Sequence, residues 1–451
     1  MPLWMPLWMP VWMPICIPPL GLRAISVVEC SQPPMAWAQE ENSKMKYVKP
    51  EEVGLSSSRL ARIDQHLQER YIEPGKISGA LTVVARRGEI AHCSPLGHME
   101  LERKRALEEN AIFRIYSMTK PITSIATMML YERGLFQLRD PVYKYIPAFA
   151  DQGVFQMGSY PHFITEPPKR AMRIKDLLSH TSGLTYGFMH RTPVDAAYRK
   201  SGLEGVNKSG NLEETVKTIA SLPLEFSPGE RWNYSMATDV LGYLVQVVSG
   251  KPFDQFLHEE IFEPLGMVDT GFSVPPDKQP RLPACYERRM NRKLVLQDDP
   301  ATSPYLTPPQ FHSGGGGLVS TAHDYLRFAE MLRRGGELEG ARIVSRKTLE
   351  LMTKNHLPGD VDLTEMAQGS FSETPYEGVG FGLGFSVNLG PARTGATGSA
   401  GEFAWGGAAS TAFWVDPAED LSVVFLTQLL PSATYDFRAQ LRSIIYGAII
   451  D

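Results

Sequence analysis

Residues 117–134 read SMTKPITSIATMMLYERG, and no other stretch of the chain restricts the fold as strongly. Gly134 is a typical helix end, and Pro121 falls within or just after the first turn, where it costs at most one backbone hydrogen bond. The spacing of the apolar residues predicts a helix that begins near Ser117 and buries one face. That face consists of Ile122, Ile125, Ala126, Met129 and Leu130.

The same stretch places a serine and a lysine three residues apart. Residues i and i+3 of a helix lie on one face, about 5–6 Å apart at Cβ, so the Lys120 amine can reach the Ser117 hydroxyl. A serine hydroxyl attacks a carbonyl when a nearby base takes its proton, and a lysine can be that base where burial or a cationic neighbour lowers its pKa. The pattern therefore indicates a serine acyl-transfer site. A second match, Ser43 to Lys46, has no apolar helical face and is attributed to chance.

Composition and charge place the chain among ordinary globular proteins. Its 451 residues are 43% apolar and 21% charged, and the chain is long enough to form the hydrophobic cores of two or three domains. A net charge of −5 gives no electrostatic reason to expect nucleic acid or an anionic membrane as a partner. The four cysteines have no metal-type spacing, so neither a metal, a disulfide framework nor another cofactor is expected. They are Cys16, Cys30, Cys93 and Cys285.

Residues 1–45 are predicted to be an N-terminal extension, unstructured or leader-like. They repeat Met-Pro-Leu-Trp twice and then give Met-Pro-Val-Trp, with prolines too frequent for a membrane-spanning helix. Residues 36–38, Ala-Trp-Ala, resemble a cleavage site, but no basic region precedes them. We favour a cytoplasmic location, with export to the periplasm as the alternative. A wrongly chosen start, with Met35 or Met45 as the true one, is a further explanation.

The two ends of the chain are predicted to fold together. Apolar spacing indicates helices over 55–70 and 437–448, and alternating β-branched runs indicate hairpins over 79–91 and 411–427. We therefore expect an α/β domain built from both ends, a helical and loop domain inserted in the middle, and a site between them. The predicted boundaries are 46–133 with 301–451 for the first domain and 134–300 for the second.

Three further segments carry polar or glycine-rich motifs. Residues 228–235, PGERWNYS, place Tyr234 before an apolar stretch, where its hydroxyl could relay a proton. His180 lies among Ser, Thr and Gly and is interpreted as a turn residue rather than a base. The tract at 313–317, SGGGG, lacks the ending of a phosphate loop, which favours close backbone packing near the site.

Taken in order, five segments resemble the motifs of the serine β-lactamase and penicillin-binding protein superfamily. The chain is most similar to the family VIII carboxylesterases, which are similar to class C β-lactamases, and the resemblance extends from Pro50 to the C-terminus. It implies an α/β (α+β), β-lactamase-like fold: an antiparallel sheet flanked by helices plus an inserted, mainly helical domain, with the active site between them. The segments are Ser117-x-x-Lys120, LLSHTSGL at 177–184, PGERWNYS at 228–235, GGGLVST at 315–321 and WGG at 405–407.

The resemblance also implies roles for single residues. Ser117 matches the acylated nucleophile, Lys120 its general base and Tyr234 the tyrosine of the second motif. The oxyanion hole would be the backbone N–H groups of Ser117 and Ala408. The expected substrate-binding positions are Trp405, Gly406 and Gly407, which stand where β-lactamases have Lys-Thr-Gly, and Met236, which stands where class C enzymes have an asparagine.

Met236 and Trp405 both remove polar recognition of β-lactams, so the resemblance implies a carboxylesterase for short-chain acyl esters. It would act through an acyl-Ser117 intermediate on a small-molecule ester, with weak β-lactam hydrolysis left open. A class C-like β-lactamase, a D-amino-acid peptidase, an acyltransferase and a penicillin-binding module without turnover are the alternatives. The chain contains neither Gly-x-Ser-x-Gly nor His-Glu-x-x-His, which disfavours an α/β-hydrolase and a zinc hydrolase. The sequence gives no prediction of oligomeric state.

Overall fold

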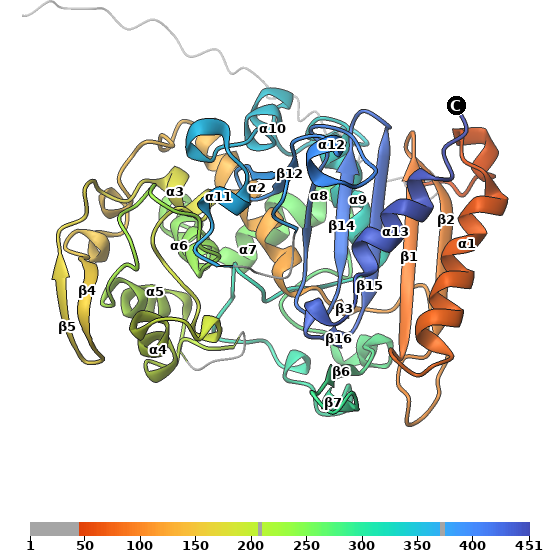
Figure 1. Cartoon of the computed structure of the whole chain (residues 1–451), viewed down its shortest axis with the longest axis horizontal. Helices are drawn as coiled ribbons and strands as arrows, with labels where there is room; N and C mark the ends of the chain where they lie inside the picture. The colour runs from red at the N-terminus through yellow and green to blue at the C-terminus, as the bar shows by residue number, and fades with distance from the viewer. Residues whose placement is uncertain (1–44, 206–209, 370–374) are drawn as a thin grey trace, which may run out of the picture. The chain divides into compact units, whose positions relative to one another are not determined.

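A central antiparallel sheet joins the two ends of the chain (Figure 1). The computed structural model describes residues 45–205, 210–369 and 375–451, and within these the sheet has seven strands. Strands β1 and β15 pair with each other, with Val83 opposite Val424, so both predicted hairpins are present and share one sheet. The order is β11 (Val379–Phe381), β12 (Ser386–Asn388), β13 (Phe403–Gly406), β14 (Ala412–Asp416), β15 (Leu421–Thr427), β1 (Gly79–Arg86) and β2 (Glu89–Gly97).

Helices cover both faces of this sheet because successive strand residues point to opposite sides. Val84 and Val423 face one side, where they pack with α1 (Ser57–Leu67) and α13 (Phe437–Tyr446). Val83 and Val424 face the other side, in the core shared with α2 (Thr119–Glu132) and α9 (Ala322–Arg333). The predicted first and last helices are thus confirmed, although Ala448 lies beyond the end of α13. Burying each such aliphatic side chain contributes roughly 1.5–3 kcal/mol.

The middle of the chain supplies helices and short hairpins that continue the α2 core. Helix α6 (Ala237–Ser249) packs on α2, and the apolar core runs without a break from one to the other. The proposed domain boundaries at 134 and 300 stay a prediction. The remaining elements are α3 (Ile174–Leu178), α4 (Pro193–Lys200), α5 (Leu212–Ala220), α7 (Phe253–Leu257), α8 (Glu263–Leu265), α10 (Arg346–Met352), α11 (Leu363–Met366), α12 (Pro391–Thr394), β3 (Phe113–Arg114), β4 (Val154–Ser159), β5 (His162–Glu166), β6 (Cys285–Arg288), β7 (Leu294–Asp298), β8 (Val319–Ser320), β9 (Glu337–Leu338), β10 (Ala341–Arg342) and β16 (Leu429–Leu430).

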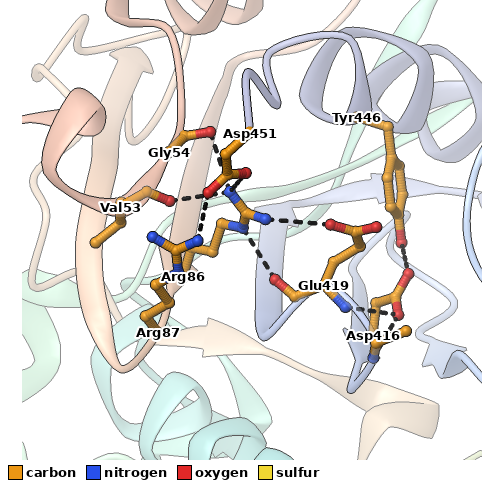
Figure 2. Close-up of polar contacts among 9 residues, drawn as sticks. Val53, Gly54, Arg86, Arg87, Asp416, Glu419, Tyr446 and Asp451 are labelled. Atoms are coloured by element: carbon orange, nitrogen blue, oxygen red, sulfur yellow. Dashed lines mark hydrogen bonds and ion pairs between the residues drawn. The ribbon is translucent and has the colours of Figure 1, made fainter.

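Arg86, at the end of β1, ties three parts of the fold together (Figure 2). Its Nη1 donates to the carbonyls of Val53 and Gly54, each at 3.0 Å, and to Asp451 Oδ1 at 2.6 Å. Its Nε donates to the carbonyl of Glu419 at 2.9 Å, and Nη2 reaches that residue's carboxylate at 3.2 Å. A buried guanidinium is tolerated when its donors are satisfied in this way, so the contacts fix Val53, Gly54 and Asp451 against the β14–β15 turn.

The predicted N-terminal extension lies outside the described residues except for Met45. Across the part of the chain that is described, none of the helices combines the length and apolarity that crossing a membrane requires.

Candidate active site

Ser117 lies at the entrance of α2 rather than inside it. Strand β3 pairs with β8 and leads into a single 3₁₀ turn, Tyr116–Met118, so the regular helix begins two residues later than the sequence predicts. Tyr116 has φ of 43°, a left-handed conformation that non-glycine residues adopt at a cost of roughly 1–2 kcal/mol. Such local strain is common next to reactive groups, where it aims a side chain. The far end of α2 matches the expectation, since Gly134 has φ of 73°.

The structure brings the three predicted catalytic side chains together. Tyr234 Oη donates a hydrogen bond of 2.6 Å to Ser117 Oγ, and Lys120 Nζ lies 3.5 Å from the same oxygen. Lys120 also donates to the carbonyl of Gly315 at 2.6 Å and to Tyr186 Oη at 3.0 Å. Ser117 is 8% exposed and Lys120 2%, so these contacts form in a largely dry setting, where hydrogen bonds and charges act strongly. The arrangement can hold a proton on any of three groups around the serine oxygen.

The glycine-rich tract presents the carbonyl that Lys120 contacts. Asp239, a buried residue of α6, accepts hydrogen bonds from Ser313 Oγ at 2.6 Å and from Gly315 N–H at 3.1 Å. A Cβ at position 315 would lie 2.7 Å from Asp239 Oδ2 and 2.8 Å from Tyr186 Oη. A side chain at 315 would force both groups to move, and a Cβ on Gly314 would lie 2.6 Å from the carbonyl oxygen of Thr238, so the tract packs closely against α6 as the sequence predicts.

An aromatic cluster surrounds Tyr234. Its ring centroid lies 5.1 Å from that of His180, 5.3 Å from Tyr186 and 5.6 Å from Trp405, and Lys120 Nζ lies 4.5 Å from it. Pairs at these separations add about 0.5–1.5 kcal/mol each beyond burial. The ring is therefore held rigidly, which keeps its hydroxyl directed at the serine.

His180 packs beside this cluster in the manner expected of a turn residue. Its φ is 53°, its carbonyl accepts from Asn233 N–H at 2.9 Å, and its Nδ1 lies 3.2 Å from Ser235 Oγ. Burial, and secondarily the charge of Lys120, lower the pKa of His180 well below its usual value. The imidazole is therefore neutral at physiological pH and adds no second positive charge.

The Trp405-Gly406-Gly407 triplet ends strand β13, which lies between β12 and β14. A Cβ on Gly407 would lie 2.4 Å from the carbonyl oxygen of Ile115, so the absence of a side chain lets the strand end approach the turn that carries Ser117. The chain then turns sharply at Ala408, with Ser410 N–H donating to the Gly407 carbonyl at 3.0 Å. Among the residues described, none accepts a hydrogen bond from the Ala408 N–H. The predicted oxyanion role of Ala408 fits this placement and stays a prediction.

The two positions that depart from the β-lactamase motifs are both buried. Trp405 and Met236 are each 2% exposed. Met236 stands just before α6, and its N–H donates to the carbonyl of Thr185 at 3.2 Å. The indole Nε1 of Trp405 has no hydrogen-bond partner within the described residues. Both positions therefore contribute mainly apolar surface.

Sequence reasoning missed three residues of this site: Tyr186, Asp239 and Gly315 as the carbonyl that Lys120 contacts. Tyr186 follows the motif at 177–184 by two residues, so proximity to that motif was an available signal. No sequence signal pointed to Asp239, because its partners Ser313 and Gly315 lie 74 and 76 residues away along the chain. A set of donors close enough to hold a metal ion occurs elsewhere in the described structure, at Cys93, Glu109 and His323.

Comparison with known proteins gives concordant results. The family model named Beta-lactamase matches residues 62–445. Protein Rv1367c of Mycobacterium tuberculosis is 36% identical over 371 residues, covering 81% of this chain and 90% of that protein. Esterase EstB of Burkholderia gladioli is 32% identical over 382 residues, covering 81% and 88%. The solved structure of EstCE1, described as a hydrolase with promiscuous acyltransferase activity, matches with a TM-score of 0.74 at 26% identity, covering 86% of this chain and 99% of that one.

Proposed function

The chain belongs to the Beta-lactamase family, and from that premise we propose that it is a serine carboxylesterase that hydrolyses short-chain acyl esters through an acyl-Ser117 intermediate. The observation that supports this most directly is the convergence of Tyr234 Oη and Lys120 Nζ on Ser117 Oγ, at 2.6 and 3.5 Å. The similarity to esterase EstB and to the hydrolase EstCE1 supports an ester as the substrate.

In the acylation step, Ser117 Oγ attacks the ester carbonyl carbon and its proton passes to the Tyr234 and Lys120 pair. The carbonyl oxygen becomes an oxyanion, which the N–H groups of Ser117 and Ala408 would stabilise. Each such donor is worth about 2.7–4 kcal/mol to a transition state. The bond to the alcohol then breaks, and the alcohol leaves with the proton that the pair had taken.

Deacylation runs the same route in reverse. A water molecule loses a proton to the Tyr234 and Lys120 pair, its oxygen attacks the acyl carbon, and Ser117 leaves and regains the proton. Whether Lys120 or Tyr234 is the deprotonated base is a property of the coupled pair rather than of either group.

The substrate class follows from the apolar character of the positions that recognise β-lactams in related enzymes. We place Trp405, Gly406, Gly407 and Met236 along the acyl group, where buried tryptophan and methionine suit a neutral aliphatic chain. A substrate carboxylate would meet Trp405 in place of a lysine. We therefore expect β-lactams to be poor substrates, although the acylating core is shared.

The decisive experiment compares the wild type with Ser117→Ala on p-nitrophenyl butyrate and on a chromogenic cephalosporin. Ser124→Ala is the matched control, because Ser124 is also a buried serine of α2 and lies seven residues after Ser117. We expect ester turnover by the wild type and the control and background rates for Ser117→Ala. Full ester activity in Ser117→Ala would exclude Ser117 as the nucleophile, and faster cephalosporin turnover would favour the β-lactamase alternative.

Acyl transfer is the second candidate, and the printed description of EstCE1 is the observation that favours it. The acyl-Ser117 intermediate is common to both reactions, since an alcohol or amine can replace water in the second step. Adding short alcohols to the ester assay and quantifying the transfer product separates the two. If the carboxylic acid is the sole product at every alcohol concentration, the protein is a hydrolase.

A further inference from the structure

Four side chains from distant segments meet at the edge strand β2, outside the site described above. Cys93 lies on β2, Glu109 in the loop before β3, and His323 in the first turn of α9. One ligand atom from each, the thiol sulfur, a carboxylate oxygen and a ring nitrogen, lies within 4.8 Å of the other two. The Tyr47 hydroxyl donates to Glu109 and lies 3.1 Å from His323 Nε2.

The chemistry of these donors is specific. A thiolate, an imidazole and a carboxylate are the ligands that Zn²⁺ takes in proteins, whereas Mg²⁺ and Ca²⁺ select oxygen donors alone. Bonds of about 2.0–2.3 Å in a tetrahedral site hold donor atoms roughly 3.3–3.8 Å apart. The three ligand atoms lie within 4.8 Å of one another, so the most distant pair would have to approach by roughly 1 Å. The 2.5 Å contact between His323 Nε2 and Glu109 Oε1 would have to lengthen by a similar amount. Side-chain rotations on this scale need no backbone rearrangement.

We propose that Cys93, Glu109 and His323 bind one zinc ion or a chemically similar divalent cation, with the Tyr47 hydroxyl or a water molecule as fourth ligand. Tyr47 is 55% exposed, so an ion can enter from solvent without opening the core. The inference is independent of the proposed esterase function, because none of these residues takes part in the acyl-transfer steps.

Binding would be coupled to loss of a proton from the thiol. Cys93 is a free, partly buried thiol. A metal ion needs the thiolate and must displace that proton.

The position of the cluster suggests what the ion would do. His323 follows β8 by three residues and Glu109 precedes β3 by four, and these two short strands pair with Phe113 opposite Ser320. Strand β3 leads to Ser117, and β8 follows the tract that contains Gly315. An ion held by both segments and by Cys93 would fasten the edge strand to the two strands that carry the active-site loops. Metal binding would then stabilise the folded chain by mass action.

The test uses the full chain, freed of metal with a chelator and titrated with Co²⁺ alone. Tetrahedral Co²⁺ with a thiolate ligand gives visible ligand-field bands and a near-ultraviolet thiolate-to-metal band. We expect one equivalent to bind, Zn²⁺ to displace it, and the midpoint of thermal unfolding to rise. Cys93→Ala should abolish the thiolate band, and His323→Ala should weaken binding by at least about tenfold. The matched controls are Cys285→Ala, which removes a buried thiol outside the cluster, and His66→Ala.

The same experiment shows whether the proposed site is wrong and whether a variant has simply failed to fold. If the wild type binds no stoichiometric Co²⁺, or if Cys93→Ala keeps the full thiolate band, the assignment is wrong and another thiol or none is the ligand. Circular dichroism of each variant establishes that it is folded before titration. If Cys93→Ala does not fold, Cys93→Ser takes its place, since it keeps a small polar side chain and should lose the thiolate band. Ester turnover is not a readout here, so failure of the esterase proposal leaves this result intact.

Discussion

Replacing Tyr234 by phenylalanine removes one hydroxyl and little else. That hydroxyl donates the 2.6 Å hydrogen bond to Ser117 Oγ, and the side chain is 1% exposed. The ring contacts with His180, Tyr186 and Trp405 do not involve the oxygen and should survive the change. Tyr234→Phe therefore separates the proton-transfer role of the tyrosine from its packing role.

The two contributions differ greatly in size. A positioned acid or base accelerates a reaction about 10²–10⁴-fold, which corresponds to roughly 2.7–5.5 kcal/mol of barrier. Loss of one buried hydrogen bond costs about 1 kcal/mol of folding stability, with a further term for leaving a buried partner unsatisfied. We expect kcat to fall within that range while KM changes little, because the hydroxyl acts on the serine and not on the bound ester.

The assay is steady-state hydrolysis of p-nitrophenyl butyrate, with kcat and KM resolved, beside urea unfolding of the same preparations. Tyr71→Phe is the matched control: Tyr71 is buried and its hydroxyl also donates at 2.6 Å, to Gln440 in the layer of α1 and α13. It should lose similar stability and keep its activity. If Tyr234→Phe retains kcat within about threefold of the wild type, Tyr234 is not in the proton path and the mechanism must run through Lys120 alone.

Three further outcomes follow from the structure. Gly407→Ala should lower kcat by about 10²-fold or more, because the new methyl group collides with the Ile115 carbonyl and displaces the oxyanion donors. Gly271→Ala is the control in the same ester assay and should keep most activity, because its new methyl group meets no atom closer than 3.8 Å. The pKa of His180 is lowered in the folded state, whereas in the unfolded chain it has the ordinary value of about 6.5. Neutral His180 therefore reduces the free energy of unfolding by nothing above about pH 6.5, and as the pH falls below that value the free energy of unfolding decreases by up to about 1.4 kcal/mol per pH unit. His180→Asn should therefore flatten the dependence of unfolding free energy on pH between about pH 7 and 5, and an unchanged slope would assign it to other groups. Arg114→Met leaves Asp298 buried without its 2.6 Å partner and should cost about 3–5 kcal/mol in urea unfolding, whereas a loss below about 1 kcal/mol would mean that solvent reaches Asp298.

Local sequence patterns predicted the helices and strands whose hydrophobic periodicity is contained within a single short stretch. The first and last helices and both terminal hairpins follow from periodicity within fewer than 20 residues. Ser117 and Lys120 were also accessible, because one turn of chain connects them whichever way the rest folds. The start of α2 was misplaced by two residues, since the left-handed Tyr116 and the 3₁₀ turn after it have no sequence signature.

Contacts between distant segments could not be predicted from spacing. Tyr234 entered only through resemblance to a family, because an isolated tyrosine is most often a core residue. Asp239 was missed because its partners lie in another segment. The same limit applies to Glu109 and His323, which are 214 residues apart and meet Cys93 only in the folded chain. The cysteine spacing predicted no metal site, and a cluster assembled by topology leaves no spacing motif to detect.

What separates hydrolysis from acyl transfer in this family of reactions is which molecule reaches the acyl-serine first, so the route from the site to the surface matters. Tyr186 receives a hydrogen bond from Lys120, and its ring stacks on Phe188 with centroids 4.6 Å apart and an interplanar angle of 20°. Phe188 is 48% exposed, so this pair extends from the buried lysine to solvent. The stacked rings of Tyr186 and Phe188 would bind the hydrocarbon part of an ester alcohol, or of an acceptor alcohol, but offer no specific binding site for water. Phe188→Ala should therefore weaken transfer to apolar alcohols more than it weakens hydrolysis, and equal losses in both reactions would place the acceptor elsewhere.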